Sequence, residues 1–255
     1  MNKLLGTTLM ATALTLSASA ALAADLMRES RTIDARFTRV KLDGVLDLVV
    51  RQGATPSLVI SGERADVARV TTRQQGETLE IGTDRRNNYA LGRNPKLRAE
   101  LVMPNLAEFV SEGVGTSTVS GFSGEKIVLA LDGAGAVTLN GSYRNVDARL
   151  GGVGSLRIDG AKAERMDLAL RGAGQLAVTG QTRALRATLA GVGNLDAEKL
   201  RAETVNLDMS GLGGATVYAS SAANLNLSGM GSATVYGKPV QRNATTDGMG
   251  KVSWR

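Results

Sequence analysis

A Gly-x-Gly triplet returns at an even spacing through the second half of this 255-residue chain. The eight triplets begin at Gly113, Gly133, Gly152, Gly172, Gly191, Gly211, Gly229 and Gly248. Successive first glycines are 20, 19, 20, 19, 20, 18 and 19 residues apart. A fixed period of this kind is typical of a solenoid, in which each repeat forms one coil and stacks on the coil before it.

Apolar and polar residues alternate on both sides of each triplet. The residue four before the first glycine is apolar in all eight repeats: Phe109, Leu129, Ala148, Leu168, Ala187, Leu207, Leu225 and Ala244. The residue six after it is apolar in all eight as well: Val119, Leu139, Ile158, Val178, Ala197, Val217, Val235 and Trp254. Alternation with a period of two indicates half-buried strands, because successive side chains of a strand point to opposite faces.

The sequence therefore predicts an all-β fold, a parallel β-solenoid (β-helix) with short strands of about five residues and Gly-x-Gly corners. Glycine suits a corner because it accepts a positive φ and a close approach of another backbone. Further glycines mark a second corner: Gly121, Gly141, Gly160, Gly180 and Gly237. Antiparallel hairpins are the structural alternative, although they would place tight two-residue turns and need not keep so constant a pitch.

Residues 1–23 have the features of a secretory signal peptide. A basic start is followed by an apolar stretch, and Ala21-Leu22-Ala23 is a typical signal peptidase site. We expect cleavage after Ala23 and export to the periplasm or the cell surface of a bacterium, with a membrane anchor as the alternative. No later stretch reaches the ~18 apolar residues that a spanning helix needs, so we expect no transmembrane segment in the mature chain.

Residues 24–110 are less regular than the rest. We expect them to form irregular first coils and a cap that covers one end of the solenoid, ahead of the regular repeats of residues 111–255. The segment from Glu63 to Val70 is the one plausible helix of the mature chain. Residues 83–96 are predicted as an exposed loop, and Leu97 to Met103 as the strand that follows it.

The composition excludes several kinds of functional site. The chain has no Cys and no His, so it lacks a thiolate nucleophile, a Ser-His-Asp triad and most ligands of transition metals. The triplets differ from a dinucleotide-binding motif, which needs a helix after the glycines. They also differ from a calcium-binding nonapeptide, which needs Asp where Leu156 stands. We therefore expect no cofactor and no metal.

The order of these parts resembles the head GIN domain family of auto-transporter adhesins. The resemblance runs from about Ile33 to Tyr236. It is carried by Phe37–Val50, Leu58–Gly62, Gly76–Ile81, Leu101–Leu106 and the run of Gly-x-Gly strands. What the resemblance implies is a right-handed parallel β-helix in an exported envelope protein, with adhesion as its function.

Two outward tyrosines are candidate ligand contacts. Tyr218 and Tyr236 stand seven residues after the first glycine of adjacent repeats, and Thr216 and Thr234 stand beside them. Two parallel rings with hydroxyl neighbours could form a platform for a sugar ring. The alternative is that the tyrosines stack across coils and only stabilise the fold.

The outward slot five residues before each first glycine carries further polar candidates. Asn206, Asn224 and Asn243 occupy it in three successive repeats, as candidate ligand contacts or as a hydrogen-bonded ladder along the solenoid. Asp147 and Asp167 occupy it earlier in the chain and would lie on adjacent coils. Such a pair could serve a sugar-cleaving enzyme. The alternative interpretation is a solvated face with balanced charge.

The net charge of the chain is +6, and its densest basic group falls near the expected loop. This group consists of Arg85, Arg86, Arg93, Lys96 and Arg98. It has one aromatic neighbour, Tyr89, so it lacks the stacking platforms of a nucleic-acid site. Anionic envelope glycans and lipid head groups fit an exported basic surface better, and a solvated loop is the alternative.

The sequence leads to one main functional hypothesis and two rivals. The main hypothesis is a non-enzymatic envelope protein whose polar solenoid faces bind glycans, lipid head groups or another protein, as an adhesin does. One rival is a carbohydrate-active enzyme that uses outward carboxylates. The other is a self-assembling envelope protein whose end rung pairs with another copy. Trp254 occupies an inward slot of the last half-coil, where it would either plug the stack or contact that other copy.

Overall fold

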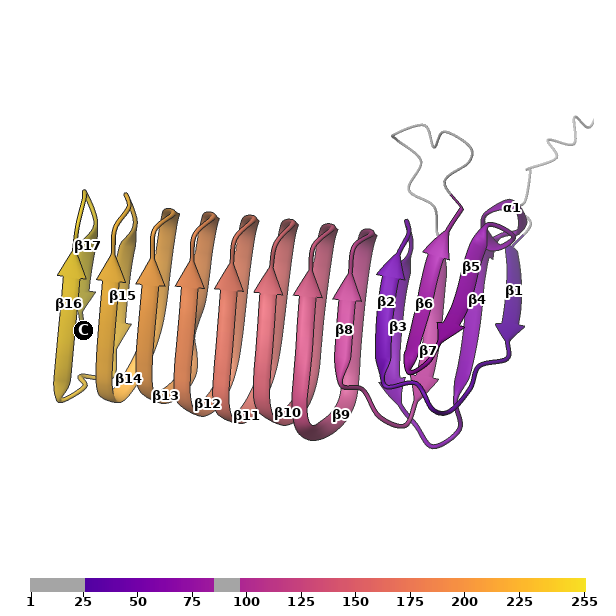
Figure 1. The fold of residues 1–255 in the computed structure, drawn as a ribbon, viewed down its shortest axis with the longest axis horizontal. Coiled ribbons are helices and arrows are strands. Elements are labelled where there is room, and N and C mark those ends of the chain that lie inside the picture. The colour runs from indigo at the N-terminus through magenta and orange to yellow at the C-terminus, as the bar shows by residue number, and fades with distance from the viewer. Residues whose placement is uncertain (1–25, 85–96) are drawn as a thin grey trace, which may run out of the picture.

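The repeats stack as coils of a parallel β-solenoid in the computed structural model, which describes residues 26–84 and 97–255 (Figure 1). The regular coils are formed by β9 (Val114–Leu131), β10 (Ala134–Leu150), β11 (Val153–Leu170), β12 (Ala173–Leu189), β13 (Val192–Met209) and β14 (Leu212–Leu227). Each pairs in parallel with the strands of the coils beside it. Three shorter strands complete the stack: β15 (Ser232–Tyr236), β16 (Gln241–Thr246) and β17 (Lys251–Trp254).

The strands of the regular coils are longer than the expected five residues. They run for 16 to 18 residues, because the hydrogen-bonded ladder passes around the second corner. The register only shifts there, as it does between Asn140 and Ser142 where β10 pairs with β9. The strands end at the other corner, where the first glycine of each triplet falls between two strands, although backbone hydrogen bonds still join neighbouring coils there.

The second glycine of the triplet is required by the distance between coils. Gly174 has a φ of +151°, and a Cβ at this position would run into the carbonyl oxygen of Gly154 in the coil before. Gly154 stands in the same relation to Gly135. A side chain therefore cannot be placed at this corner without pushing two coils apart.

The predicted inward columns form the core. Leu139 pairs with Val119 in one neighbouring coil and with Ile158 in the other, and all three are fully buried. Two members of the predicted columns are not fully buried: Ala244 is exposed and Trp254 is partly buried. Both belong to the last coil, which no further described coil covers.

Two columns alternate between large and small side chains from β9 to β13, which gives these coils a repeat two coils long. The column four residues before the triplet has Leu129, Ala148, Leu168, Ala187 and Leu207 in successive coils. The middle residue of the triplet alternates in the same way, as Val114, Ala134, Val153, Ala173 and Val192. Two such coils span 20 + 19 = 39 residues. Alternation of volumes lets neighbouring coils interlock at constant spacing.

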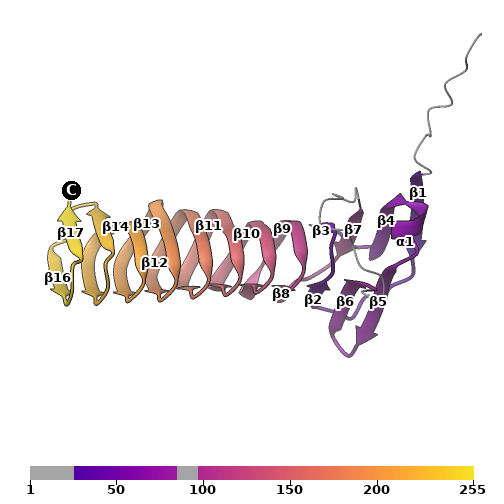
Figure 2. The same ribbon diagram turned by 90° about the horizontal axis from the view of Figure 1, so that it is seen from above.

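The N-terminal part supplies one more coil and a cap (Figure 2). The strands before the regular coils are β1 (Leu26–Arg31), β2 (Arg39–Asp43), β3 (Asp47–Gln52), β4 (Ser57–Glu63), β5 (Val70–Gln75), β6 (Thr78–Thr83), β7 (Arg98–Met103) and β8 (Glu108–Ser111). β2 and β3 form a coil that stacks in parallel on β8 and β9. β6 and β7 pair with its other side, and antiparallel pairs β1–β4, β4–β7 and β5–β6 complete the cap.

Two local predictions in this part are confirmed. The expected helical segment contains α1 (Arg64–Val67), a single turn, and β7 lies where a strand was expected. No helix within the described residues is long and apolar enough to cross a membrane. The predicted signal peptide and cleavage site lie outside the described residues.

The last half-coil ends with an aromatic residue packed on the core. Trp254 pairs with Val235 in β15, and its partly buried ring packs against the hydrophobic core. The guanidinium of Arg242 lies 5.5 Å from the centre of that ring. Trp254 thus covers the end of the core, as the plug interpretation predicts.

Candidate functional site

The outward asparagines form a ladder. Asn224 donates a hydrogen bond to the side-chain oxygen of Asn206 at 3.0 Å, and Asn243 donates to Asn224 at 2.8 Å. A parallel bond joins Asn226 to Asp208 at 3.0 Å. The ladder interpretation is confirmed. These bonds use one lone pair of Asn206, and one N–H and one lone pair of Asn224, so the NH2 group of Asn206 and the second N–H of Asn224 stay available to a ligand.

The tyrosines lie in register, as do the threonines next to them. Tyr218 pairs with Tyr236 and Thr216 with Thr234 between β14 and β15, and all four side chains are partly exposed. Two groups lie close to the Tyr218 ring. The guanidinium of Arg201 lies 5.6 Å from its centre, and a Cβ on Gly237 would lie 2.9 Å from its Cζ. The ring therefore supports Arg201 and is only partly exposed.

A groove opens beside Tyr218 because two neighbouring coils differ in length. Ala197 pairs with Val217, but the next pair joins Arg201 to Tyr218, so residues 198–200 have no counterpart in β14. The pairing between β13 and β14 therefore steps by three residues at this point. The resulting hollow has a volume of about 420 Å³, and we call it the step groove. It is lined by Ala163, Gln181, Thr182, Arg183, Arg201, Ala202, Glu203, Tyr218 and Ser220.

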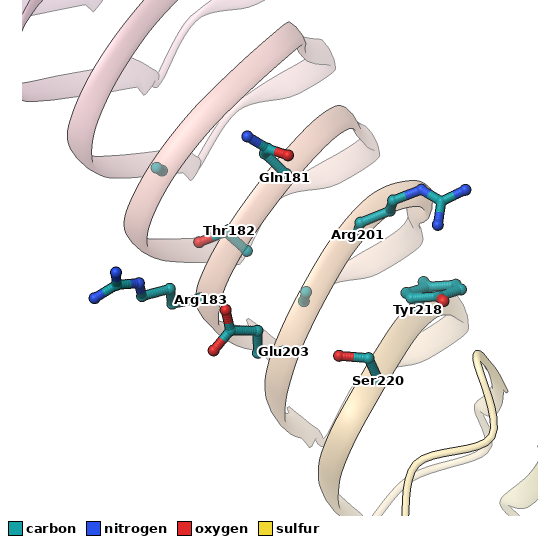
Figure 3. Close-up of a pocket in the computed structure, with 9 residues that line it drawn as sticks. Gln181, Thr182, Arg183, Arg201, Glu203, Tyr218 and Ser220 are labelled. Atoms are coloured by element: carbon teal, nitrogen blue, oxygen red, sulfur yellow. The ribbon is translucent and has the colours of Figure 1, made fainter.

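Polar side chains stand in two rows along the step groove (Figure 3). Gln181, Arg201 and Tyr218 form one row, in register across β12, β13 and β14. The second row lies two residues further along each strand and contains Arg183, Glu203 and Ser220. Residues of the intervening row, such as Ala202, point inward. The groove therefore presents hydrogen-bonding groups at two edges over a floor of backbone.

The second row belongs to a longer ladder of alternating charge. Its members lie 19 or 20 residues apart: Glu125, Arg144, Glu164, Arg183 and Glu203. Arg144 bonds Glu125 at 3.3 Å and Glu164 at 3.0 Å. The hydrogen bond from Arg144 holds the pKa of Glu164 below its ordinary value. This charge ladder ends at Glu203, at the edge of the step groove.

The two aspartates considered for catalysis are adjacent, but they line different hollows. Asp147 pairs in register with Asp167. Asp147 lies with Arg149 in a hollow of about 410 Å³, where Arg149 is bonded to Asp132 at 3.0 Å. Asp167 lines another hollow together with Arg165 and Arg186, among others. The two carboxylates therefore do not converge on one pocket.

The predicted basic group is described at one position only. Arg98 begins β7, and its Nε lies 3.4 Å from Oε1 of Glu100. The other four, Arg85, Arg86, Arg93 and Lys96, lie outside the described residues. Within residues 26–84 and 97–255, no three acidic side chains gather in a way that could hold a metal ion.

The sequence analysis missed an apolar line on the surface. The middle residues of the eight triplets are all apolar and all exposed, and we call this line the corner ridge: Val114, Ala134, Val153, Ala173, Val192, Leu212, Met230 and Met249. Leu26 and Val240 are the other large apolar residues that are exposed in the described part. The sequence did carry a signal of this ridge, because the middle residue of the triplet is apolar in every repeat. A corner that only faces water has no packing reason to exclude polar residues.

The stacked parallel coils, the capped first coil and the outward polar rows define a protein of the β-solenoid class. Within that class, the chain belongs to the family described as "Putative auto-transporter adhesin, head GIN domain", whose model matches residues 36–239. The resemblance stated from the sequence is thus confirmed. No match to a curated protein was found.

Several solved structures share the fold. A "putative adhesin" from Parabacteroides distasonis has 17% identity and a TM-score of 0.79, with 91% of this chain and 98% of that chain covered. A "putative lipid binding protein" from the same species has 17% identity and a TM-score of 0.78, with 91% and 98% covered. A "putative adhesin" from Bacteroides fragilis has 19% identity and a TM-score of 0.69, with 90% and 97% covered. At these identities the likeness extends to the fold alone.

Proposed function

We propose that this chain is an exported, non-enzymatic envelope protein that binds glycans through the outside of its solenoid, as an adhesin does. The step groove carries this proposal, because it brings Arg201, Glu203, Gln181 and Ser220 to the edges of one open hollow. Sugars are bound by such planar and hydroxyl-bearing polar groups on a rigid support. The family description agrees with this function.

The binding proposal is tested with an array of bacterial and host polysaccharides. We expect the wild-type protein to bind a subset of glycans, and a double variant of the step groove, Arg201→Ala with Glu203→Ala, to lose that binding. The matched control is Arg186→Ala, which also removes an exposed charge from β12 but lies outside the step groove. Turnover of a polysaccharide that Asp147→Asn or Asp167→Asn abolishes would instead favour the enzyme.

Export is tested by adding protease to intact cells and to cells with a breached outer membrane. We expect a mature chain that begins at Ala24, which mass spectrometry of the protein from cells would verify. Cleavage on intact cells would place the solenoid at the cell surface and agree with adhesion. Protection that ends on breaching would place it in the periplasm and contradict a role in adhesion to other surfaces.

A second candidate function, contact with a lipid surface, is favoured by the corner ridge. The ridge residues from Val114 to Leu212 pair in register from coil to coil, so a flat apolar surface could contact these coils together. The residues on either side of the corners from Val192 to Met230 are uncharged, so this part of the ridge could approach lipid without burying charge. The name of one solved relative, a lipid binding protein, agrees with this candidate.

Sedimentation with phosphatidylcholine vesicles tests the lipid candidate. We expect the double variant Val153→Ser, Val192→Ser to reduce the bound fraction several-fold, because those side chains are 61% and 57% exposed on the ridge. Leu26→Ser is the control, since Leu26 is 69% exposed but lies away from the ridge. Equal binding by all three proteins would exclude the ridge as the contact.

A further inference from the structure

We propose that the step groove takes an acidic sugar, a pyranose that carries a single carboxylate, with Arg201 as the carboxylate ligand. This inference rests on the proposed glycan binding and names the class of sugar. It follows from three features of the groove: the supported arginine, the charges that line it and its remaining polar side chains.

The positive edge is a supported and unused arginine. Arg201 lies over the Tyr218 ring at 5.6 Å, and it forms no ion pair with any of the described residues. Some arginines of the solenoid are paired instead, such as Arg144 with Glu164 and Arg157 with Asp159. Stacking on an aromatic ring fixes the guanidinium plane and leaves its N–H groups free, which suits bidentate bonding to a carboxylate.

The charges that line the groove limit the charge of the ligand. Glu203 lies two residues from Arg201 on the same strand, so the two backbone positions are about 6.6 Å apart. With Arg183 the lining carries two positive charges and one negative charge, so a single carboxylate balances it, whereas a doubly charged anion such as a phosphate monoester does not. Hydroxyl groups of a sugar would instead donate hydrogen bonds to Glu203.

The remaining lining completes a site for one sugar ring. Gln181 lies beside Arg201 on the previous coil, and Ser220 stands on the next coil beyond Glu203. Both can donate to and accept from ring hydroxyls. A volume of about 420 Å³ falls within the range of small-molecule sites, roughly 300–1,000 Å³. The open shape also leaves room for the chain on either side of the bound sugar.

The test compares two ligands that share the sugar and the linkage but differ at the carboxylate. Calorimetry is performed with a galacturonic acid oligomer and with its methyl ester, which keeps the sugar and the linkage but removes the carboxylate charge. We expect the acid to bind at least tenfold more tightly than the ester. Arg201→Gln should lose that preference, and Tyr218→Leu should weaken it because the guanidinium loses its support. Arg186→Gln is the matched control and should bind as the wild type does.

The outcomes separate this inference from the proposed function. Equal affinity for acid and ester, unchanged in Arg201→Gln, would overturn the acidic-sugar inference while glycan binding survives. Binding of neither ligand, with positive binding of other glycans on the array, would also overturn it. An absence of binding to any glycan would overturn the proposed function itself. Circular dichroism of each variant shows that the fold is kept, so a lost preference reports on the site.

Discussion

Single residues at the corners set how closely two coils can approach. We expect Gly174→Ala to destabilise the fold by about 2–4 kcal/mol, because its Cβ meets the Gly154 carbonyl and its φ is +151°. Gly160→Ala is the matched control, since its φ is +67° but no atom lies within 4 Å of the added Cβ. The free energy of unfolding of that variant should fall by only about 1 kcal/mol. Urea unfolding measures both, and equal losses would contradict the role of coil contact.

Removal of two buried hydroxyls, those of Ser117 and Thr182, should change the free energy of unfolding in opposite directions. The Ser117 hydroxyl is buried in the core without a hydrogen-bond partner among the described residues. Ser117→Ala should therefore raise the free energy of unfolding by about 1 kcal/mol. The Thr182 hydroxyl is bonded to the carbonyl of Ala184 at 3.2 Å, so Thr182→Val should lower it by about 1 kcal/mol. A loss of stability in Ser117→Ala would show that its hydroxyl is satisfied.

Exposed ion pairs of the charge ladder link neighbouring coils, and these pairs depend on pH. Because Arg144 lowers the pKa of Glu164 in the folded protein, their interaction stabilises the fold above the ordinary pKa of 4.5. The stabilisation is lost as the pH falls through the lowered pKa. We expect Arg144→Gln to raise the titration midpoint of Glu164, measured by carbon-13 NMR of its carboxyl. Arg157→Gln, which breaks the pair with Asp159, should leave that midpoint unchanged.

The elements also show what the sequence could and could not predict. The coil period and the inward columns were predictable, because corner glycines and apolar slots recur at fixed positions. Strand length was not, since second-corner glycines such as Gly141 suggested a break that the ladder passes through. The step groove was visible only as an 18-residue spacing after one of 20. Its chemistry depends on how Arg201 lies over Tyr218, which spacing alone does not determine.

The coils from β9 to β13 alternate in pairs, so deletions among them should respect that unit. Removing residues 152–190, two coils, brings Arg144 next to Glu203 and Ala148 next to Leu207, which keeps both alternations. Removing residues 172–190, one coil, brings Glu164 next to Glu203 and Leu168 next to Leu207. We expect the larger deletion to be more stable than the smaller one by about 1–3 kcal/mol. In the smaller deletion, two like charges and two large side chains lie next to each other. Thermal unfolding measures the difference, and the reverse order would contradict the two-coil repeat.

The direction of the backbone hydrogen bonds determines how the rod bears load. The bonds between coils run along the axis, and each coil is tied only to its neighbours. A pull along the axis therefore strains one ladder at a time, at the end of the stack, and a freed coil of 19 residues adds about 65 Å of extended chain. A rod held at one end and bound at the other would lengthen in steps of that size. The unfolding of single coils would therefore lower the tension on the bound ligand.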